Sequence, residues 1–111
     1  MFFGRPKFAS LNMGQAKKDL EQDGKIVLVD VRTPGEYADG HLPHSRNIPL
    51  DRIKTIETAV PDKGAKLYVY CLSGARSHSA CGVLTKLGYT DVTNIGGIGG
   101  WTGTIERGKA S

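Results

Sequence analysis

The sequence predicts a single α/β domain built on a central, mostly parallel β-sheet flanked by α-helices. Its 111 residues are enough for one domain but not for two. Short apolar segments such as residues 26–29 are typical of strands that are buried on both faces, as parallel strands are. Segments with helical spacing alternate with these strands, which is the pattern of α/β folds. Fifteen glycines, about twice the usual share, also predict sharp turns or close backbone approaches.

Each expected element follows from a local pattern. Gly24 stands where a helix over residues 13–23 would end. The segment 33–37 predicts the cap and first turn of a short helix, with Thr33 as the cap, Pro34 at the first position and Glu36 placed as in a capping box. Apolar side chains recur at helical spacing over residues 75–87, and Gly88 ends that helix. The remaining expected elements are a leader or edge segment over residues 1–9, strands over 26–29, 46–48, 67–70 and 92–95, and helical turns over 51–60. We expect one domain over residues 1–111, with a core over about 13–107.

Composition excludes several classes of protein. Apolar residues make up 39% and charged residues 23% of the chain, which is not the balance of a disordered protein. The longest apolar run, residues 67–72, is far shorter than the roughly twenty residues that span a bilayer. The amino terminus has no signal-peptide core, and two cysteines are too few for a disulfide scaffold. We therefore expect a soluble, cytoplasmic chain with no membrane partner.

The charge pattern says little about function and is best interpreted as solvated surface lysines with one or two functional arginines. The net charge is +4, but the basic residues are scattered, and the pair Lys17-Lys18 is the longest basic run. Proteins that bind nucleic acid usually concentrate positive charge on one face or arm, so no nucleic-acid partner is expected. A modest positive potential still favours the approach of small anions.

The strongest local signal for chemistry is the segment CLSGARS, residues 71–77. A cysteine ends an expected strand, a short loop with Gly74 follows, and a helix then begins. The first amides of a helix lack partners within the helix and favour a negative charge, so this position should lower the pKa of the Cys71 thiol. Arg76 adds a permanent cation with a planar set of donors. The alternative is that Cys71 is a small buried apolar residue, as cysteines often are.

Three segments resemble the rhodanese family of sulfurtransferases. The segment CLSGARS resembles the active-site loop of that family. The stretch DVRTPGEYADGHLPHSRNIPL resembles its pattern D-V-R…E-Y/F…G-H-I…N-I-P, and NIGGIGGW resembles its closing glycine-rich turn and tryptophan. These segments occur in the family's order over residues 26–101. Two residues depart from the pattern: His44 stands where glycine is frequent, and Arg46 stands where a small residue is usual.

The resemblance implies a rhodanese-like fold and a sulfurtransferase without a cofactor. Cys71 would accept a sulfane sulfur from thiosulfate or a similar donor and form a persulfide, and cyanide, a thiol or a protein acceptor would then take that sulfur. Arg76 would hold the sulfonate oxygens of the donor, since a dianion calls for charge-assisted hydrogen bonds. The substrate cradle would be formed by the backbone amides of Leu72, Ser73, Gly74, Ala75, Arg76 and Ser77.

Two other functions stay open at this point. Related phosphatases and arsenate reductases place five residues between cysteine and arginine, whereas four separate Cys71 from Arg76 here. One residue fewer removes roughly 3 Å of chain, which favours sulfur over phosphorus. The other alternative is a carrier module whose Cys71 holds a persulfide for a partner and turns over thiosulfate poorly.

Asp30 and Arg32 follow a buried strand and are interpreted as structural support for the site. They would satisfy loop amides or one another rather than act as an acid–base pair. His41 and His44 lie in an expected turn, and no further ligand gives a metal spacing, so no metal site is expected.

Two further residues lie on the helix over 75–87. His78 is expected to face solvent. Cys81 borders the apolar stripe of that helix and is expected to be buried packing; the alternative is a resolving thiol, which would need access that the helix geometry makes awkward.

Overall fold

The structure, a computed structural model, describes residues 7–109. Its centre is a five-stranded sheet in the order β1-β5-β4-β2-β3, and all neighbouring strands are parallel. This arrangement confirms the predicted α/β fold with a parallel sheet. The strands are β1 (Ala9–Ser10), β2 (Val27–Asp30), β3 (Arg46–Asn47), β4 (Lys66–Cys71) and β5 (Asp91–Gly97).

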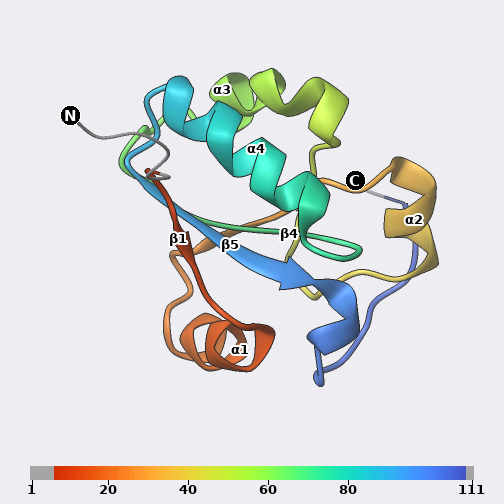
Figure 1. The fold of residues 1–111 in the computed structure, drawn as a ribbon. Helices are drawn as coiled ribbons and strands as arrows, with labels where there is room; N and C mark the ends of the chain where they lie inside the picture. Colours follow the sequence, from red (N-terminus) through yellow and green to blue (C-terminus); the bar gives the residue numbers. More distant parts are fainter. Residues whose placement is uncertain (1–6, 110–111) are drawn as a thin grey trace.

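Helices cover both faces of the sheet (Figure 1). Helix α1 (Met13–Gln22) packs on one face, while α4 (Ala75–Lys86), the 3-10 helix η1 (Leu50–Thr55) and α3 (Ile56–Ala59) lie on the other. Helix α2 (Pro34–Asp39) follows β2, and the short η2 (Ile98–Gly100) follows β5. Each helical segment expected from the sequence is present, and α2 begins with the predicted capping box, in which Thr33 and Glu36 exchange hydrogen bonds.

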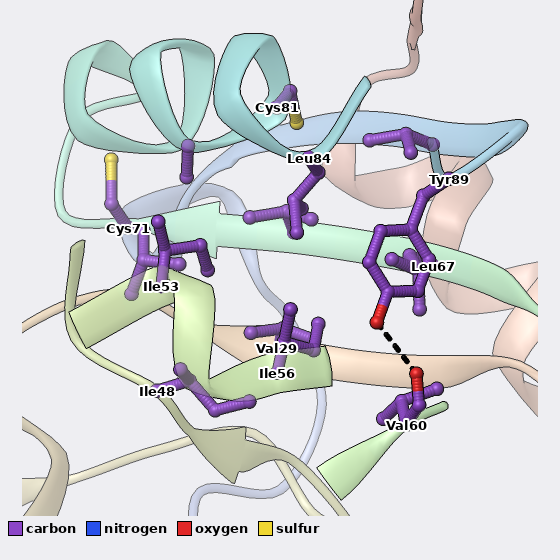
Figure 2. Close-up of a cluster of buried hydrophobic side chains, with 14 residues drawn as sticks. Val29, Ile48, Ile53, Ile56, Val60, Leu67, Cys71, Cys81, Leu84 and Tyr89 are labelled. Carbon is purple, nitrogen blue, oxygen red and sulfur yellow. Dashed lines mark hydrogen bonds between the residues drawn. The ribbon is translucent and has the colours of Figure 1, made fainter. Parts of the chain in front are cut away.

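Strand β4 places its side chains alternately on the two faces, as a strand must. Leu67, Val69 and Cys71 belong to the apolar cluster beneath α4, which Figure 2 shows. Tyr68 and Tyr70 belong to the second cluster, on the side of α1. This alternation directs the last residue of the strand, Cys71, toward the first turn of α4.

A bulge turns the end of β5 toward the loop that follows Cys71. Val69 of β4 pairs with Asn94, but the next residue, Tyr70, pairs with Gly96, so Ile95 is one extra residue in β5. A Cβ atom on Gly97 would overlap the backbone of residues 72 and 73. Glycine is therefore required here, which is one of the close backbone approaches that the glycine content predicted.

The two departures from the family pattern lie on the exposed side of the β2–β3 connection. His44 has a φ of 65°, in the left-handed region where a non-glycine residue carries a cost of about 1 kcal/mol. That backbone shape is a physical reason for glycine to be frequent at this position. Arg46 lies in β3, is exposed, and its Nη1 donates to the carbonyl of Ala59 at 3.4 Å.

Strand β1 lies at one edge of the sheet and pairs with β5. Residues 1–6 of the expected leader or edge segment are outside the described residues. Across residues 7–109, no helix has the length and apolar character needed to cross a membrane.

Candidate active site

Cys71 lies where β4 ends and its side chain is fully buried. A short loop follows, and α4 begins with Gly74 as its N-cap, at a φ of +102°. No side chain caps this end of the helix. The first amides of α4 are therefore available to the sulfur atom, whose negative form they favour.

The surroundings of the sulfur lower the pKa of the Cys71 thiol. Burial acts against this, because it favours the neutral thiol. Hydrogen bonding outweighs burial: the Ser77 Oγ atom lies 3.4 Å and the Gly74 amide nitrogen 3.0 Å from Sγ, and the amides of Ser73 and Ser77 contribute as well. The direction is the one expected for a cysteine between a strand and a helix, and it raises the share of reactive thiolate.

Cys81 behaves differently. Its side chain is buried on α4, and Figure 2 shows its sulfur well separated from that of Cys71, farther along the helix. Burial, followed by the nearby negative charge of Cys71, raises the pKa of Cys81 to about 12. The buried packing role expected for Cys81 is thus matched by its surroundings, and this thiol stays protonated near neutral pH.

Arg76 forms a two-pronged ion pair with Glu36 of α2. The Nη1–Oε1 distance is 2.7 Å and the Nη2–Oε2 distance is 2.9 Å. The bond from Arg76 holds the pKa of Glu36 at about 2. The sequence pattern assigned Glu36 only to the capping box with Thr33, and the carboxylate makes both sets of bonds. A guanidinium has five N–H donors, so Arg76 retains donors for a ligand.

Asp30 and Arg32 pair with each other at the end of β2. Arg32 Nη2 lies 2.7 Å from Asp30 Oδ2, and the backbone amide of Arg32 donates to Asp30 Oδ1 at 2.8 Å. Arg32 also donates to the carbonyl of Gly40 at 2.6 Å, and Asn47 donates to the carbonyls of Asp30 and Arg32. Both charged side chains are buried and fully engaged, an arrangement that holds the loop ends in place rather than presenting a free base.

The outer part of the loop is open to solvent. Leu72, Ser73 and Ala75 are exposed, and Leu72, with 55% of its surface accessible, is the one exposed large apolar side chain within residues 7–109. His78 is exposed on α4, as expected, with its ring edge-on to Phe8 at 5.2 Å. These residues form the rim of the site around the buried sulfur.

The two histidines of the turn, His41 and His44, lie in different surroundings. His41 is buried, its ring stacks on Tyr37 at 3.7 Å, and its Nδ1 lies 2.7 Å from the Tyr37 carbonyl. His44 is exposed. In the described part of the chain, no group of three or more His, Cys, Asp or Glu side chains is placed to hold a metal ion.

Two residues near the sulfur were not identified from the sequence. Asn94 of β5 lies with its Oδ1 atom 2.7 Å from Ser77 Oγ, and Gly97 packs against the loop backbone. Asn94 was interpreted only as part of the strand over residues 92–95, and Gly97 only as part of the glycine-rich turn that follows it. Their position depends on the bulge at Ile95, which no local sequence pattern indicates.

The chain is similar to several known proteins. Residues 13–104 match the family described as rhodanese-like domain. The thiosulfate sulfurtransferase PspE of Escherichia coli (strain K12) is 45% identical over 71 residues, which cover 63% of this chain and 68% of PspE. A sulfurtransferase of Allochromatium vinosum is 39% identical over 93 residues, 83% of each chain.

A more distant relative carries a different name. The putative sulfur carrier protein YrkF of Bacillus subtilis (strain 168) is 31% identical over 91 residues, which cover 81% of this chain and 49% of YrkF. Among solved structures, a rhodanese with anions from E. coli superposes with a TM-score of 0.71 at 39% identity, covering 75% of this chain and 99% of the other.

Proposed function

Because this chain belongs to the rhodanese-like domain family of sulfurtransferases, we propose that it moves a sulfane sulfur from thiosulfate, or a similar small anionic donor, to a thiophilic acceptor through a persulfide on Cys71. One observation carries the proposal: the sulfur of Cys71 lies at the start of α4, under hydrogen bonds that lower the pKa of its thiol. The thiolate is the form that attacks another sulfur atom. We propose that the single domain over residues 1–111 carries out both half-reactions.

In the first half-reaction, the Cys71 thiolate attacks the outer sulfur of thiosulfate. A new S–S bond forms to Cys71, the S–S bond of thiosulfate breaks, and sulfite leaves with the electron pair. In the second half-reaction, the acceptor attacks the outer sulfur of the persulfide, and the Cys71 thiolate is released. With cyanide as the acceptor, the product is thiocyanate. The cycle needs no net oxidant or reductant.

The loop amides are assigned to two negatively charged groups, the Cys71 thiolate and the anionic donor. The amides of Ser73, Gly74 and Ser77 act on the sulfur of Cys71. We assign the remaining amides of residues 72–77 to the cradle of the donor, because converging backbone N–H groups stabilise anions without reorganisation. Asp30 and Arg32 support this end of the sheet from β2 and take no part in the chemistry.

Arg76 is assigned to the sulfonate end of the donor. Its guanidinium keeps unused N–H donors beyond the two that bind Glu36. The charge of Glu36 offsets that of Arg76, so a dianion is attracted less strongly than by a free arginine. Glu36 therefore moderates the affinity for the donor and fixes the orientation of the guanidinium.

A persulfide carrier is the second candidate. The exposed Leu72 next to the nucleophile is suited to contact with a partner protein, since an apolar side chain at the rim gains by being covered. The similarity to a protein named as a putative sulfur carrier supports the same alternative. A carrier would form the persulfide on Cys71 but would transfer its outer sulfur to cyanide only slowly.

The test compares sulfur transfer with phosphate-ester hydrolysis, each measured on the same protein samples. Thiocyanate formation from thiosulfate and cyanide is measured beside hydrolysis of a phosphate ester, with the wild type and Cys71→Ser. We expect thiocyanate turnover that Cys71→Ser abolishes and no phosphate release. A persulfide without thiocyanate turnover would select the carrier instead. Phosphate release that depends on Cys71 would overturn the assignment to sulfur chemistry.

A further inference from the structure

The Ser77 hydroxyl has more hydrogen-bond partners than hydrogens. Its oxygen lies 2.7 Å from Asn94 Oδ1, 3.0 Å from the Gly74 carbonyl and 3.4 Å from the Cys71 sulfur. A hydroxyl carries one hydrogen, so it can donate to only one of these atoms at a time. The Asn94 oxygen is the nearest of the three acceptors, and the Cys71 sulfur is the one that gains a full negative charge on ionisation, so these two are the main competitors for the hydrogen.

The orientation of the Asn94 amide group is fixed by the backbone. Its Oδ1 accepts the amide hydrogen of Gly96 at 3.0 Å, and its Nδ2 faces the Gly74 carbonyl at 3.4 Å. A backbone N–H can only donate, so the atom beside it must be the oxygen. The same oxygen faces Ser77, which must therefore be the donor in the 2.7 Å bond. The bulge at Ile95 creates this arrangement by bringing Gly96 around to the side chain of Asn94.

The protonation state of Cys71 decides which competitor is favoured. A thiol donates its own hydrogen to the Ser77 oxygen, and the Ser77 hydrogen is then free to bind Asn94. A thiolate has no hydrogen and attracts donors, since bonds to an ionised acceptor are roughly twice as strong as neutral ones. When the Ser77 hydrogen turns to the sulfur, Asn94 Oδ1 keeps the Gly96 amide, so neither atom is left without a partner.

We propose that Asn94 is a positioning residue for sulfur transfer, whose side-chain oxygen holds the Ser77 hydrogen while Cys71 is a thiol and yields it to the sulfur when the sulfur becomes negative. The thiol proton leaves to solvent, and the Ser77 O–H bond only changes direction. The proposal rests on Cys71 being the nucleophile of the proposed function. Asn94 acts through Ser77 and does not touch the reacting atoms.

Other charges around the sulfur remain in place whichever way the hydroxyl points. Arg76 of α4 interacts with the Cys71 charge, and Glu36 of α2 binds Arg76. Cys81 is the other titratable group of the helix that interacts with Cys71, and η1 packs its apolar Ile53 in the same cluster. The other titratable or charged side chains of α4 and α2 are exposed: His78, Lys86 and Asp39. The end of strand β2 carries the buried pair Asp30 and Arg32, and η1 carries the exposed Asp51, Arg52 and Lys54.

The test is a double-mutant cycle on the reactivity of Cys71. The alkylation rate of Cys71 by iodoacetamide is measured against pH, with thiolate absorbance as a second readout, for Ser77→Ala, Asn94→Ala and the double variant. Below the pKa of the thiol, one pKa unit changes the rate about tenfold. We expect Ser77→Ala to slow alkylation by about tenfold, because the thiolate loses a donor, and Asn94→Ala to speed it by about threefold to tenfold, because the donor loses its competitor.

The double variant shows whether Asn94 positions the Ser77 hydroxyl or only anchors the loop. It should match Ser77→Ala within about twofold, since Asn94 acts only through the hydroxyl. If Asn94→Ala instead slows alkylation and its effect adds to that of Ser77→Ala, Asn94 only anchors the loop and the proposal is wrong.

Where Asn94→Ala does not fold, Asn94→Asp keeps both acceptor bonds. It should slow alkylation more with Ser77 present than in the Ser77→Ala background, and equal slowing in both would overturn the proposal. These readouts use no thiosulfate, so they stand apart from the test of sulfur transfer.

Discussion

Arg76 and Glu36 lie 40 positions apart in the chain and pair beside the loop that follows Cys71, with both guanidinium–carboxylate distances below 3 Å. The pair ties the first turn of α4 to α2 and brings a cation next to the loop that holds Cys71. Arg76 is thereby positioned by a partner that also caps α2. We expect the affinity for the proposed donor and the acid stability of the domain to depend on this ion pair.

Replacing Arg76 with alanine should weaken the use of thiosulfate mainly through binding. The variant loses charge-assisted hydrogen bonds of about 1.5–3 kcal/mol, which corresponds to roughly a tenfold to hundredfold rise in KM. The partial neutralisation by Glu36 places the expected change at the lower end of that range. Steady-state kinetics with thiosulfate and cyanide measure it, with Lys86→Ala at the far end of α4 as a control of the same charge change. An unchanged KM in Arg76→Ala would show that this side chain does not bind the donor.

Replacing Glu36 with glutamine should have the opposite effect on KM. Glutamine still serves in a capping box, so α2 is expected to form, while Arg76 keeps its full charge for the donor. We expect KM for thiosulfate to fall severalfold, corresponding to about 1 kcal/mol of Coulomb energy, and the difference to shrink with added salt. Glu57→Gln, which breaks the exposed pair with Lys63, is the matched control. A higher KM in Glu36→Gln would mean that orientation of Arg76 matters more than its charge.

The same pair should make folding stability depend on pH. The pKa of Glu36 is about 2 in the folded protein, below the value of about 4.3 in an unfolded chain. A carboxylate with a depressed pKa stabilises the folded state fully above the unfolded value, and this contribution is lost as pH falls toward the folded value. Denaturant titrations of wild type and Glu36→Gln should therefore show a difference in unfolding free energy that shrinks from about pH 4.5 to pH 2. A difference that is constant over this range would contradict the ion pair.

Gly97 should be intolerant of any side chain. An added Cβ would overlap the Leu72 carbonyl oxygen and lie 2.9 Å from the Ser73 Cα, and neither backbone atom can move without displacing the loop. We expect Gly97→Ala to lower kcat/KM by at least about tenfold and to lower the Tm, as overpacking typically costs about 1–3 kcal/mol. Gly99→Ala is the control, because a Cβ there meets nothing within 4 Å. Equal behaviour of the two variants would show that the loop has room to adjust.

The sequence was sufficient to predict the main helices and strands of the fold, because each of them carries its own local signal, whereas the short η2 was not predicted. Continuous apolar runs predicted β2 and β4, and Thr33 with Glu36 predicted the start of α2. The position of Cys71 between a strand and a helix also predicted the direction in which its pKa is shifted. The strands, the capping box and the position of Cys71 are set by residues that are close together in the chain, so they can be identified from the sequence alone.

The relationships that complete the site could not be predicted in the same way. Glu36 meets Arg76 only because α2 and α4 converge at the carboxyl end of the sheet. Asn94 reaches Ser77 only because Ile95 forms a bulge against β4. Both depend on tertiary register, which no spacing within a single segment reveals. The family motif contains all of these residues but gives no indication of their contacts.

The central claim is that Cys71, and not Cys81, carries the transferred sulfur. Intact-protein and peptide mass spectrometry after incubation with thiosulfate test it most directly, beside Cys71→Ser and Cys81→Ser. Since the pKa of Cys71 is lowered while that of Cys81 is raised to about 12, we expect a gain of one sulfur atom on Cys71 alone. Cys71→Ser should abolish the adduct, and Cys81→Ser should retain it. A persulfide on Cys81, or a Cys71–Cys81 disulfide required for turnover, would contradict this account.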